Sequence, residues 1–383
     1  MNMWENKKIG DIVDIRRGAS PRPIQNFLSD KGMPWVKIAD ATSDPTRFIS
    51  HTNECIIEDG IKKSVVVEPE TLIVSNSATP GLPKIMKILA CVHDGWLVFS
   101  NYRGITRDFL YYKFIDIRRH LVNQANGSVF QNLKTDIVRE FDIAVPSIET
   151  QNKIVGILSS IDHKIETNIA INDNLQQQAA ALFANFYDRA ETEVGFTEII
   201  QILGGGTPKT GESSYWNGNV PFFTPKDVGS PYTLTTEKTI TEEGLAHCNS
   251  RLYPVNTVFV TARGTVGKVG LPGVPMAMNQ SCYALVGKDT HQLLVYFYTL
   301  KAVDRLKHKA SGAVFDAITT RDFESEIIMK LFDDDEKAFL DVAKPIYQAV
   351  LSNSIENSRL AALRDSLLPK LMSGEIDVSD IQL

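Results

Sequence analysis

Few residue groups in this sequence have the types and spacing that chemistry requires. The segment GTPKTGES, residues 206–213, has glycines spaced as in a phosphate-binding loop, but Glu212 stands where that loop needs a lysine. The two glycines of residues 264–267 lie too close together before Lys268 to form such a loop. Both segments are therefore predicted to be turns.

The sequence gives little indication of a metal site or of acid–base catalysis. His51 and Cys55 are spaced to share a helical face, but no nearby residues complete a set of four metal ligands. Residues 162–164 and 335–337 carry an acid two positions before a lysine, as some nucleases do, yet both lie in predicted helices, where charges usually face solvent. No dinucleotide-binding fingerprint is present. We therefore expect no catalytic residues, no metal and no cofactor on this chain. The cysteines lack a CxxC pair and are expected to be reduced thiols: Cys55, Cys91, Cys248 and Cys282.

The composition and charge exclude some classes of protein. The chain has 383 residues, 43% hydrophobic and 22% charged, which is typical of a soluble protein with room for two domains. Its net charge of −6 excludes a uniformly basic DNA binder. Residues 331–383 hold 5 Lys and Arg against 10 Asp and Glu, and residues 333–336 precede an apolar run as carboxylates do at a helix start. Without a membrane-length apolar stretch or an apolar signal core, a cytoplasmic protein with no membrane partner is expected.

The sequence repeats itself at an offset of 185 to 188 residues. IGDI at residues 9–12 returns as FTEI, MPWVKIAD at 33–40 as VPFFTPKD, and TLIVS at 71–75 as TVFVT. Ala19-Ser20-Pro21 returns as Gly-Thr-Pro, and NGSVFQNL at 126–133 as SGAVFDAI. Several matches in one order at one offset indicate a tandem duplication. Each copy begins with short strand-like segments separated by Gly and Pro.

Each copy ends in a long helical pattern. Apolar residues step 4,3,4,3 from Ile154 to Phe186 and from Phe339 to Leu371, as in the seam of a coiled coil. About 33 residues at ~1.5 Å each give a rod of roughly 50 Å. If the helices pair antiparallel, two asparagine pairs meet in the seam and fix its register, unless these side chains face solvent: Asn168 with Asn357, and Asn172 with Asn353.

The expected fold is therefore α+β. Two globular domains of mixed α/β structure are joined by two long helices in an antiparallel coiled coil, a pseudo-two-fold dumbbell. The expected boundaries are 1–149 for the first domain, 150–190 for the first helix, 191–332 for the second domain, and 333–383 for the second helix and tail.

Several motifs resemble the specificity subunit of type I restriction-modification systems. RDSLLPKLMSGEIDV at 364–378 is similar to that family's ending, and Gly-Thr-Pro at 206–208, Pro-Lys-Asp at 225–227 and RGTVGKVG at 263–270 are similar to its internal motifs. The first copy departs from the pattern, because SATPGLPK at 77–84 replaces RGTVGKVG.

The resemblance implies two target-recognition domains that read an asymmetric, bipartite double-stranded DNA site and direct adenine methylation and restriction by partner subunits. It implies that the helices space these domains and bind two methyltransferase (modification) subunits, with restriction and translocase subunits in the same complex. S-adenosylmethionine, ATP and Mg are expected on those partners. Two alternatives remain: the specificity subunit of a related system with cleavage and methylation on one other chain, and a coiled-coil scaffold that binds protein or glycan instead of DNA.

Phosphates are contacted by flexible cations and bases by Arg, Lys, Asn or Gln. In the first domain the candidate DNA-binding residues are Arg16, Arg17, Arg22, Lys37, Arg103, Arg107, Asn126, Ser128 and Gln131. In the second domain they are Thr207, Lys209, Thr210, Tyr215 with Trp216 nearby, Lys226, Arg263, Lys268, Asn279 and Gln280.

Overall fold

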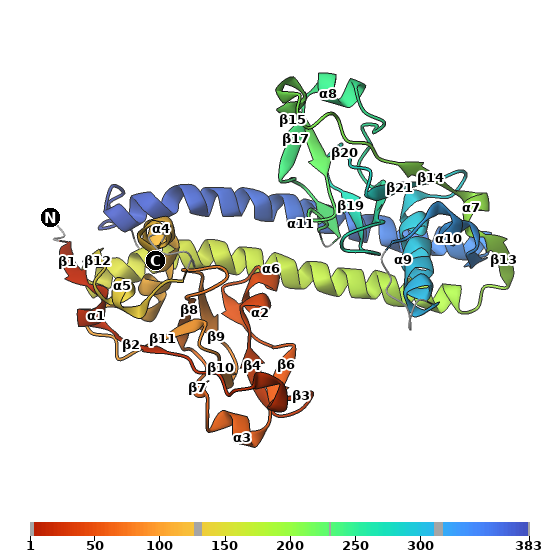
Figure 1. Ribbon diagram of the computed structural model, residues 1–383. Helices are drawn as coiled ribbons and strands as arrows, with labels where there is room; N and C mark the ends of the chain where they lie inside the picture. The colour runs from red at the N-terminus through yellow and green to blue at the C-terminus, as the bar shows by residue number, and fades with distance from the viewer. Residues whose placement is uncertain (1–3, 126–131, 230, 310–316, 382–383) are drawn as a thin grey trace. The chain divides into compact units, whose positions relative to one another are not determined.

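A computed structural model describes residues 4–125, 132–229, 231–309 and 317–381. The chain divides into two compact units: unit 1 is residues 1–166 with 359–383, and unit 2 is residues 167–358. The division falls inside both long helices, so each unit holds part of each helix together with one globular domain (Figure 1). Within the described residues, no helix is both long enough and apolar enough to cross a membrane.

Unit 1 is built from three antiparallel or mixed sheets. Their strand orders are β1-β12, β3-β6-β4-β10-β7 and β2-β11-β8-β9-β5. The strands are β1 (Glu5–Lys8), β2 (Asp14–Arg17), β3 (Leu28–Ser29), β4 (Met33–Val36), β5 (Phe48–Ile49), β6 (Glu54–Ile56), β7 (Val65–Val67), β8 (Leu72–Ser75), β9 (Pro83–Met86), β10 (Ala90–Val92), β11 (Trp96–Ser100) and β12 (Asp142–Val145). The helices are α1 (Ile9–Ile12), η1 (Ile24–Asn26), α2 (Ile38–Ser43), α3 (Glu58–Ile61), α4 (Arg107–Ala125), α5 (Thr135–Arg139) and the first part of α6 (Ile148–Tyr187).

Unit 2 has the strand orders β13-β22, β14-β21-β18-β19-β16 and β17-β15-β20. Its strands are β13 (Thr192–Gly195), β14 (Ile200–Gly204), β15 (Trp216–Phe223), β16 (Tyr232–Thr233), β17 (Lys238–Ile240), β18 (Val258–Thr261), β19 (Val269–Pro272), β20 (Ala277–Met278), β21 (Cys282–Gly287) and β22 (Ile327–Lys330). Its helices are α7 (Phe196–Ile199), η2 (Ser213–Tyr215), α8 (Glu242–Ala246), α9 (Gln292–Lys309), α10 (Thr320–Glu324) and the first part of α11 (Asp333–Ser373).

The two units repeat one topology, as the sequence repeat predicts. The order β2-β11-β8-β9-β5 of unit 1 matches β14-β21-β18-β19-β16 of unit 2, and β6-β4-β10 matches β17-β15-β20. The directions also agree, because β4 with β10 and β15 with β20 are both parallel pairs in otherwise antiparallel surroundings. Unit 1 extends this second sheet by β3 and β7. The mixed α/β class and the duplication predicted from the sequence are therefore confirmed.

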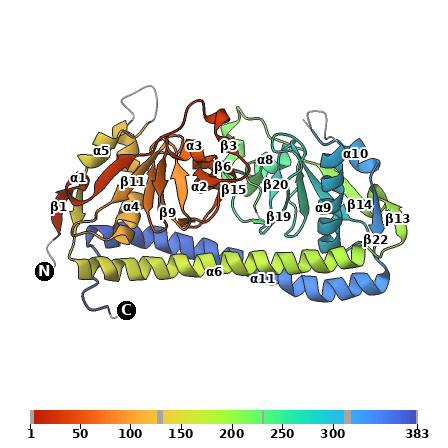
Figure 2. The ribbon, with the colours of Figure 1, turned by 90° about the horizontal axis from the view of Figure 1, so that it is seen from below.

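Helices form a second layer in each unit. In unit 2, α9 packs on the sheet and on both long helices at once, since the Phe297 ring lies 4.9 Å from Phe183 of α6 and 5.1 Å from Phe339 of α11. In unit 1, α4 takes the same place beside α6 (Figure 2). Tyr112 of α4 reaches α6 through a 2.6 Å hydrogen bond to Asp162. Each domain core is thus continuous with its share of the helices.

The long helices pair antiparallel within each unit. In unit 2, Asn168 Nδ2 donates to Asn357 Oδ1 at 2.8 Å, and Asn353 Nδ2 donates to Asn172 Oδ1 at 2.9 Å. These are the contacts that the antiparallel register predicts, and Asn168 and Asn172 are buried. In unit 1, Arg364 of α11 pairs with Asp162 of α6 at 2.8 Å.

Three expectations need correction, those for Asp162, Asp335 and the pair His51 and Cys55. Asp162 is buried, not solvent-facing, because α4 covers the side of α6 that the partner helix leaves open. Asp335 lies in the first turn of α11 and is also largely covered, paired with Arg189 at 2.5 Å. Helix α11 ends before Gly374, whose φ of +78° turns the chain into the C-terminal tail. Cys55 lies in β6, so it shares no helical face with His51.

Candidate nucleic-acid interface

Each unit brings two loops together at the end of one parallel strand pair, β4 with β10 in unit 1 and β15 with β20 in unit 2. In unit 1, Lys37 follows β4 and His93 follows β10; since Trp35 lies opposite Cys91 in this pair, Lys37 and His93 are neighbours. In unit 2, Thr224 follows β15 and Asn279 follows β20 in the same arrangement. Carboxyl ends of adjacent parallel strands are a common place for a ligand, because the side chains that follow them converge.

A third segment crosses directly over this strand end. A Cβ on Gly18 would meet the His93 carbonyl oxygen at 2.1 Å, and a Cβ on Gly205 would meet the Asn279 carbonyl oxygen at 2.0 Å. Only glycine permits so close an approach of two backbones. The crossing establishes that His93 and Asn279 are structural equivalents.

A side-chain hydrogen bond joins the same two loops in both units. Ser20 Oγ donates to Asp94 Oδ1 at 2.6 Å, and Thr207 Oγ1 donates to Gln280 Oε1. Ser20 and Thr207 are matched positions of the repeat, so Asp94 is the equivalent of Gln280. The loop that carries Thr207 is therefore fixed to the strand end in unit 2, as the corresponding loop is in unit 1.

The neighbouring loops are also held alike. Asp40 Oδ2 accepts the Lys37 backbone N–H at 2.8 Å, and Asp227 Oδ2 accepts that of Thr224 at the same distance. The hydroxyl of Ser75 bridges its loop to the Thr79 carbonyl oxygen at 2.5 Å.

In unit 2, Thr261 makes the same bridge to the carbonyl oxygen of Thr265. This match equates the SATPGLPK and RGTVGKVG segments and places Arg263 where unit 1 has Ser77. Both are loops and not phosphate-binding turns at a helix start.

In unit 1 the carboxylate of Asp94 organises the cations around the strand end. Arg22 Nη2 lies 3.2 Å from Asp94 Oδ2, and Arg17 donates from Nε to the Asp94 carbonyl oxygen at 2.6 Å. The hydrogen bond from Ser20, assisted by both arginines, holds the pKa of Asp94 below its ordinary value. Burial lowers the pKa of His93. The positive charges of Lys37 and Arg17 lower it too, and the opposing effect of Asp94 and Asp40 is smaller than the sum of these. Burial therefore favours the neutral form of the imidazole.

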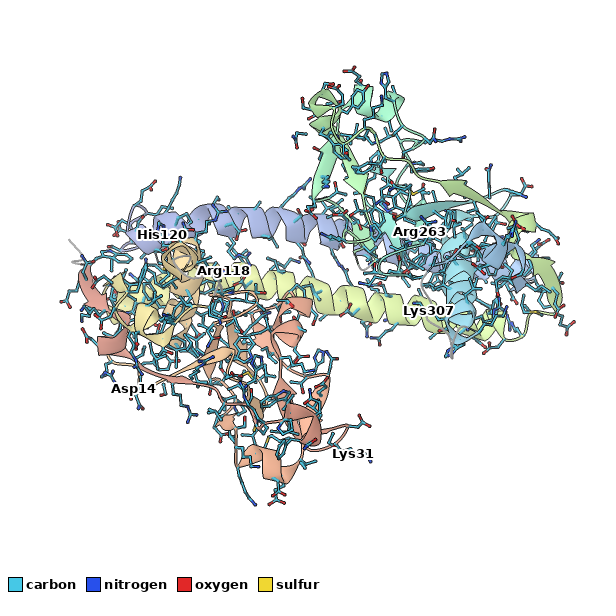
Figure 3. All side chains as sticks on the ribbon, in the orientation of Figure 1. Asp14, Lys31, Arg118, His120, Arg263 and Lys307 are labelled. Atoms are coloured by element: carbon cyan, nitrogen blue, oxygen red, sulfur yellow. The ribbon has the colours of Figure 1, made fainter. Side chains whose placement is uncertain are left out.

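Unit 2 presents a different set of charges at the same place. Gln280 replaces the carboxylate, and a hollow of about 350 Å³ is bordered by Lys226, Lys238 and Arg263 with Thr224 and Asn279. Arg263 is exposed (Figure 3) and forms no ion pair with any residue that the structure describes. Lys226 has only a 4.0 Å contact with Glu237. Cations here remain available for an anionic ligand.

Other predicted residues of unit 1 lie away from the strand end. Arg17 pairs with Leu97 and Asp14 with Ser100, so Arg103, which contacts Asp14 Oδ1 at 2.8 Å, lies at the opposite end of these strands. Asp14, labelled in Figure 3, is the first residue of β2, and Arg17 is its last. Arg107 begins α4 and pairs with Glu70 at 2.5 Å.

Arg16 of β2 donates to the Val66 carbonyl oxygen at 3.0 Å. Asn126, Ser128 and Gln131 lie outside the described residues. The structure thus brings Arg17, Arg22 and Lys37 together, but not the whole predicted set.

The remaining residues of unit 2 lie on the loop before β15 and after β18. Lys209 and Thr210 are exposed, and the Lys209 carbonyl oxygen accepts the indole N–H of Trp216 at 3.1 Å. Tyr215 stacks on His247 with ring centroids 5.0 Å apart. Lys268 is exposed at the end of the RGTVGKVG loop.

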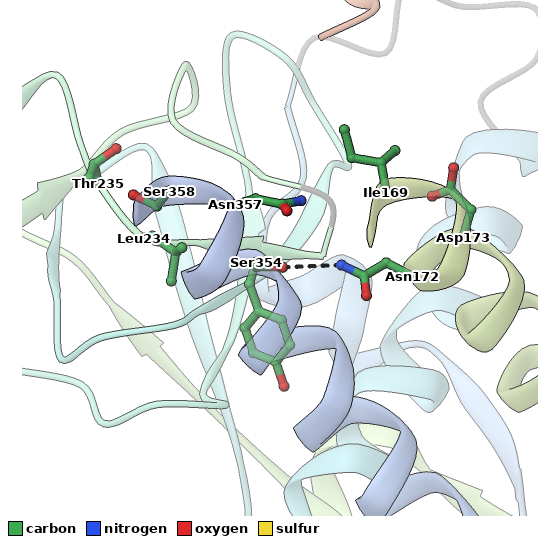
Figure 4. A pocket seen from close by; sticks show the side chains of 9 residues that line it. Ile169, Asn172, Asp173, Leu234, Thr235, Ser354, Asn357 and Ser358 are labelled. Carbon is green, nitrogen blue, oxygen red and sulfur yellow. Dashed lines mark hydrogen bonds between the residues drawn. The ribbon is translucent and has the colours of Figure 1, made fainter. Parts of the chain in front are cut away.

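A separate polar hollow of about 290 Å³ lies beside the asparagine pairs of unit 2 (Figure 4). Asn172 and Ser354 face each other across it with a long hydrogen bond of 3.5 Å, and Tyr232, Leu234 and Thr235 complete its domain side. Within the described part of the chain, no group of three or more His, Cys, Asp or Glu could hold a metal ion.

His93 and Asp94 are missing from the sequence prediction, although a signal for them exists. The offset of 186 that relates TLIVS to TVFVT, applied to Asn279 and Gln280, leads to His93 and Asp94. The chemistry of the two pairs differs, so residue type alone did not suggest the match.

A duplicated α/β unit with donors and cations at one strand end of each copy indicates a protein with two related binding units. The chain belongs to the family of type I restriction modification DNA specificity domains, whose model matches residues 1–177 and 192–330.

Specificity subunits are among the proteins similar to this chain. The chain is 22% identical to the type I restriction enzyme MjaIX specificity subunit of Methanocaldococcus jannaschii, over 99% of this chain and 94% of that protein. It is 24% identical to the HindI specificity subunit of Haemophilus influenzae, over 67% of this chain and 73% of that protein. The crystal structure of the type I system S subunit from M. genitalium shares the fold, with a TM-score of 0.57, 15% identity, and 97% and 96% of the two chains covered.

Proposed function

We propose that this chain is the DNA-sequence-recognition subunit of a type I restriction-modification complex. Each unit reads one half of an asymmetric, bipartite double-stranded site, and the chain itself carries out no chemistry. Two modification subunits bind the long helices and methylate adenine with S-adenosylmethionine, and restriction subunits use ATP and Mg. The location is the cytoplasm, where the chromosome is available.

One observation carries the proposal: the two units keep one loop frame but present different groups from it. Asp94 faces Arg17 and Arg22 in unit 1, whereas unit 2 has Gln280 at the matching position and a hollow bordered by cations such as Arg263. Different donors and charges on the same frame favour different base sequences. A duplicated protein that read the same half-site twice would have no need of this divergence.

The charge distribution is compatible with DNA binding. Part of the negative charge of the C-terminal region stabilises a helix. Residues 333–336 form the first turn of α11, where their carboxylates interact favourably with the helix dipole. Exposed cations at the strand ends are then the groups that phosphates would meet.

The test is a gel-shift series with the chain bound to its modification subunits, on DNA carrying the site and on scrambled DNA, from 50 to 200 mM salt. A protein that neutralises 6 to 10 phosphates loses roughly 10³- to 10⁵-fold in affinity over this range. The site itself is found by mapping methylated adenine in the host genome with and without the gene. A complex that ignores DNA at 50 mM salt contradicts the proposal and favours the scaffold alternative.

A further inference from the structure

The two strand ends share one detail that goes beyond a common frame. His93 Nδ1 accepts the backbone N–H of Gly95 at 2.8 Å, and Asn279 Oδ1 accepts the backbone N–H of Ser281 at 3.0 Å. In both units, therefore, the side chain accepts a hydrogen bond from the residue two positions on. Imidazole Nδ1 and amide Oδ1 occupy the same place.

This contact decides which chemical group the side chain offers outward. A neutral imidazole that accepts at Nδ1 must carry its proton on Nε2, and an amide that accepts at Oδ1 is left with its Nδ2 hydrogens. His93 is neutral because burial lowers its pKa. Both units thus point an N–H donor away from the backbone at equivalent positions.

The donors border hollows, and each side chain is held in place. In unit 1, a hollow of about 610 Å³ is lined by His93, Lys37, Arg22 and Trp35, and the His93 ring lies 6.1 Å from that of Trp35. Only 19% of the His93 side chain is exposed. In unit 2, Asn279 lines the hollow that Arg263 and Lys238 also border. Each side chain therefore borders a hollow that cations also line.

We propose that His93 and Asn279 are the specificity-determining residues of the two units, and that each donates a hydrogen bond to an acceptor on a base edge of its own half-site. The matching acceptors in the major groove are N7 of either purine, O6 of guanine and O4 of thymine. The neighbouring cations hold the flanking phosphates. This inference rests on the proposed function and names the residues that carry its specificity.

Two pairs of variants separate the donor from the frame. His93→Asp and Asn279→Asp keep an oxygen that accepts the Gly95 or Ser281 N–H but replace the outward donor by an acceptor. His93→Asn and Asn279→His keep both the inward acceptor and an outward donor, each taking the residue of the other unit. Gln201→Glu, at an exposed position of β14, adds a negative charge to unit 2 away from the hollow and controls for general repulsion of DNA.

Each variant is assembled with its modification subunits and incubated with a randomised DNA library, and the methylated sequences are read. We expect Asn279→Asp to lose preference at one base position of one half-site by about 10-fold or more. The other half-site should be unchanged, and His93→Asp should give the reverse pattern. The donor-keeping variants should retain the preferred base at those positions. Circular dichroism and thermal unfolding confirm that each variant folds.

The outcomes are distinct. If wild-type complex does not bind DNA, the proposed function fails and the inference fails with it. If wild-type complex binds and both aspartate variants keep the same preferred bases in both half-sites, the inference alone is overturned. Equal weakening on all sequences, matched by Gln201→Glu, also overturns it, because it assigns the effect to charge.

Discussion

Removing Arg364 should destabilise unit 1 more than removing any exposed cation of the same helix. Asp162 Oδ1 accepts from Arg364 Nη1 at 2.8 Å, and Asp162 Oδ2 accepts from Tyr112 Oη at 2.6 Å. The Asp162 side chain is 7% exposed and that of Arg364 25% exposed. The carboxylate is thus buried and depends on one cation and one hydroxyl.

The expected loss of unfolding free energy follows from the buried Asp162 carboxylate, which Arg364→Met leaves without its cation. Methionine keeps most of the alkyl stem of Arg364. Breaking a buried pair by removing one partner costs about 3–5 kcal/mol, and water that reaches the quarter-exposed Arg364 site favours the lower end, about 3 kcal/mol. Asp162→Asn removes the buried charge, and Arg364 retains Asp365 at 2.9 Å, so about 1–2 kcal/mol is expected. The double variant leaves no buried charge and should resemble Asp162→Asn alone.

Tryptophan fluorescence in denaturant measures these changes for unit 1 alone. Three of the four tryptophans lie in unit 1, so the background variant Trp216→Phe removes the signal of unit 2. Arg359→Met, an exposed cation on the same helix, is the control and should change the free energy of unfolding by less than about 0.5 kcal/mol. If the effects of Arg364→Met and Asp162→Asn simply add in the double variant, the two side chains are not coupled and the reasoning is wrong.

Three further predictions address the helices, the imidazole and the loop crossing. Replacing Asn168 and Asn357 together by Leu should leave unit 2 as stable or more stable in denaturant, whereas Asn168→Leu alone should cost about 1–3 kcal/mol because it strands a polar partner; equal losses in both would contradict this. A lowered pKa means that the folded state disfavours protonated His93, so wild-type protein should lose thermal stability as the pH falls below the ordinary value of 6.5, and His93→Asn should lose less; parallel curves would refute it. Gly205→Ala, whose Cβ would meet a carbonyl oxygen at 2.0 Å, should lower stability in thermal unfolding by about 3 kcal/mol, while Gly211→Ala in open space should change it by less than about 0.5 kcal/mol. Similar effects of both glycine variants would show that the crossing is not tight.

Features that repeat along the chain could be predicted from the sequence. The 4,3 stepping of apolar residues predicts helices close to the observed α6 and α11, and the antiparallel register predicts which asparagines meet. The 4,3 stepping is a local pattern, so each stretch of the sequence indicates by itself that it is helical. The start of α11 at Asp333 follows from the run of carboxylates in the same way.

Features that depend on contacts between distant segments could not be predicted. A heptad pattern identifies the seam of a helix pair but does not indicate a third element on another face. The burial of Asp162 under Tyr112 of α4 therefore could not be predicted from it. The strand-end site needs the parallel pairing of β4 with β10, which brings together segments 56 residues apart, Lys37 and His93. Basic residues could be identified by type, yet only the strand register shows that Arg103 lies far from Arg17.

Which positions the two units keep, and which they change, has a physical explanation. Gly18 and Gly205 are kept because any side chain there would strike a carbonyl oxygen and destabilise the fold. His93 and Asn279 differ, but both accept a backbone N–H that would otherwise lose its partner in a partly buried loop. The fold therefore constrains only the inward atom of this side chain and leaves its outward end free to vary. A recognition protein whose reading positions meet this condition can change the sequence it binds without losing stability.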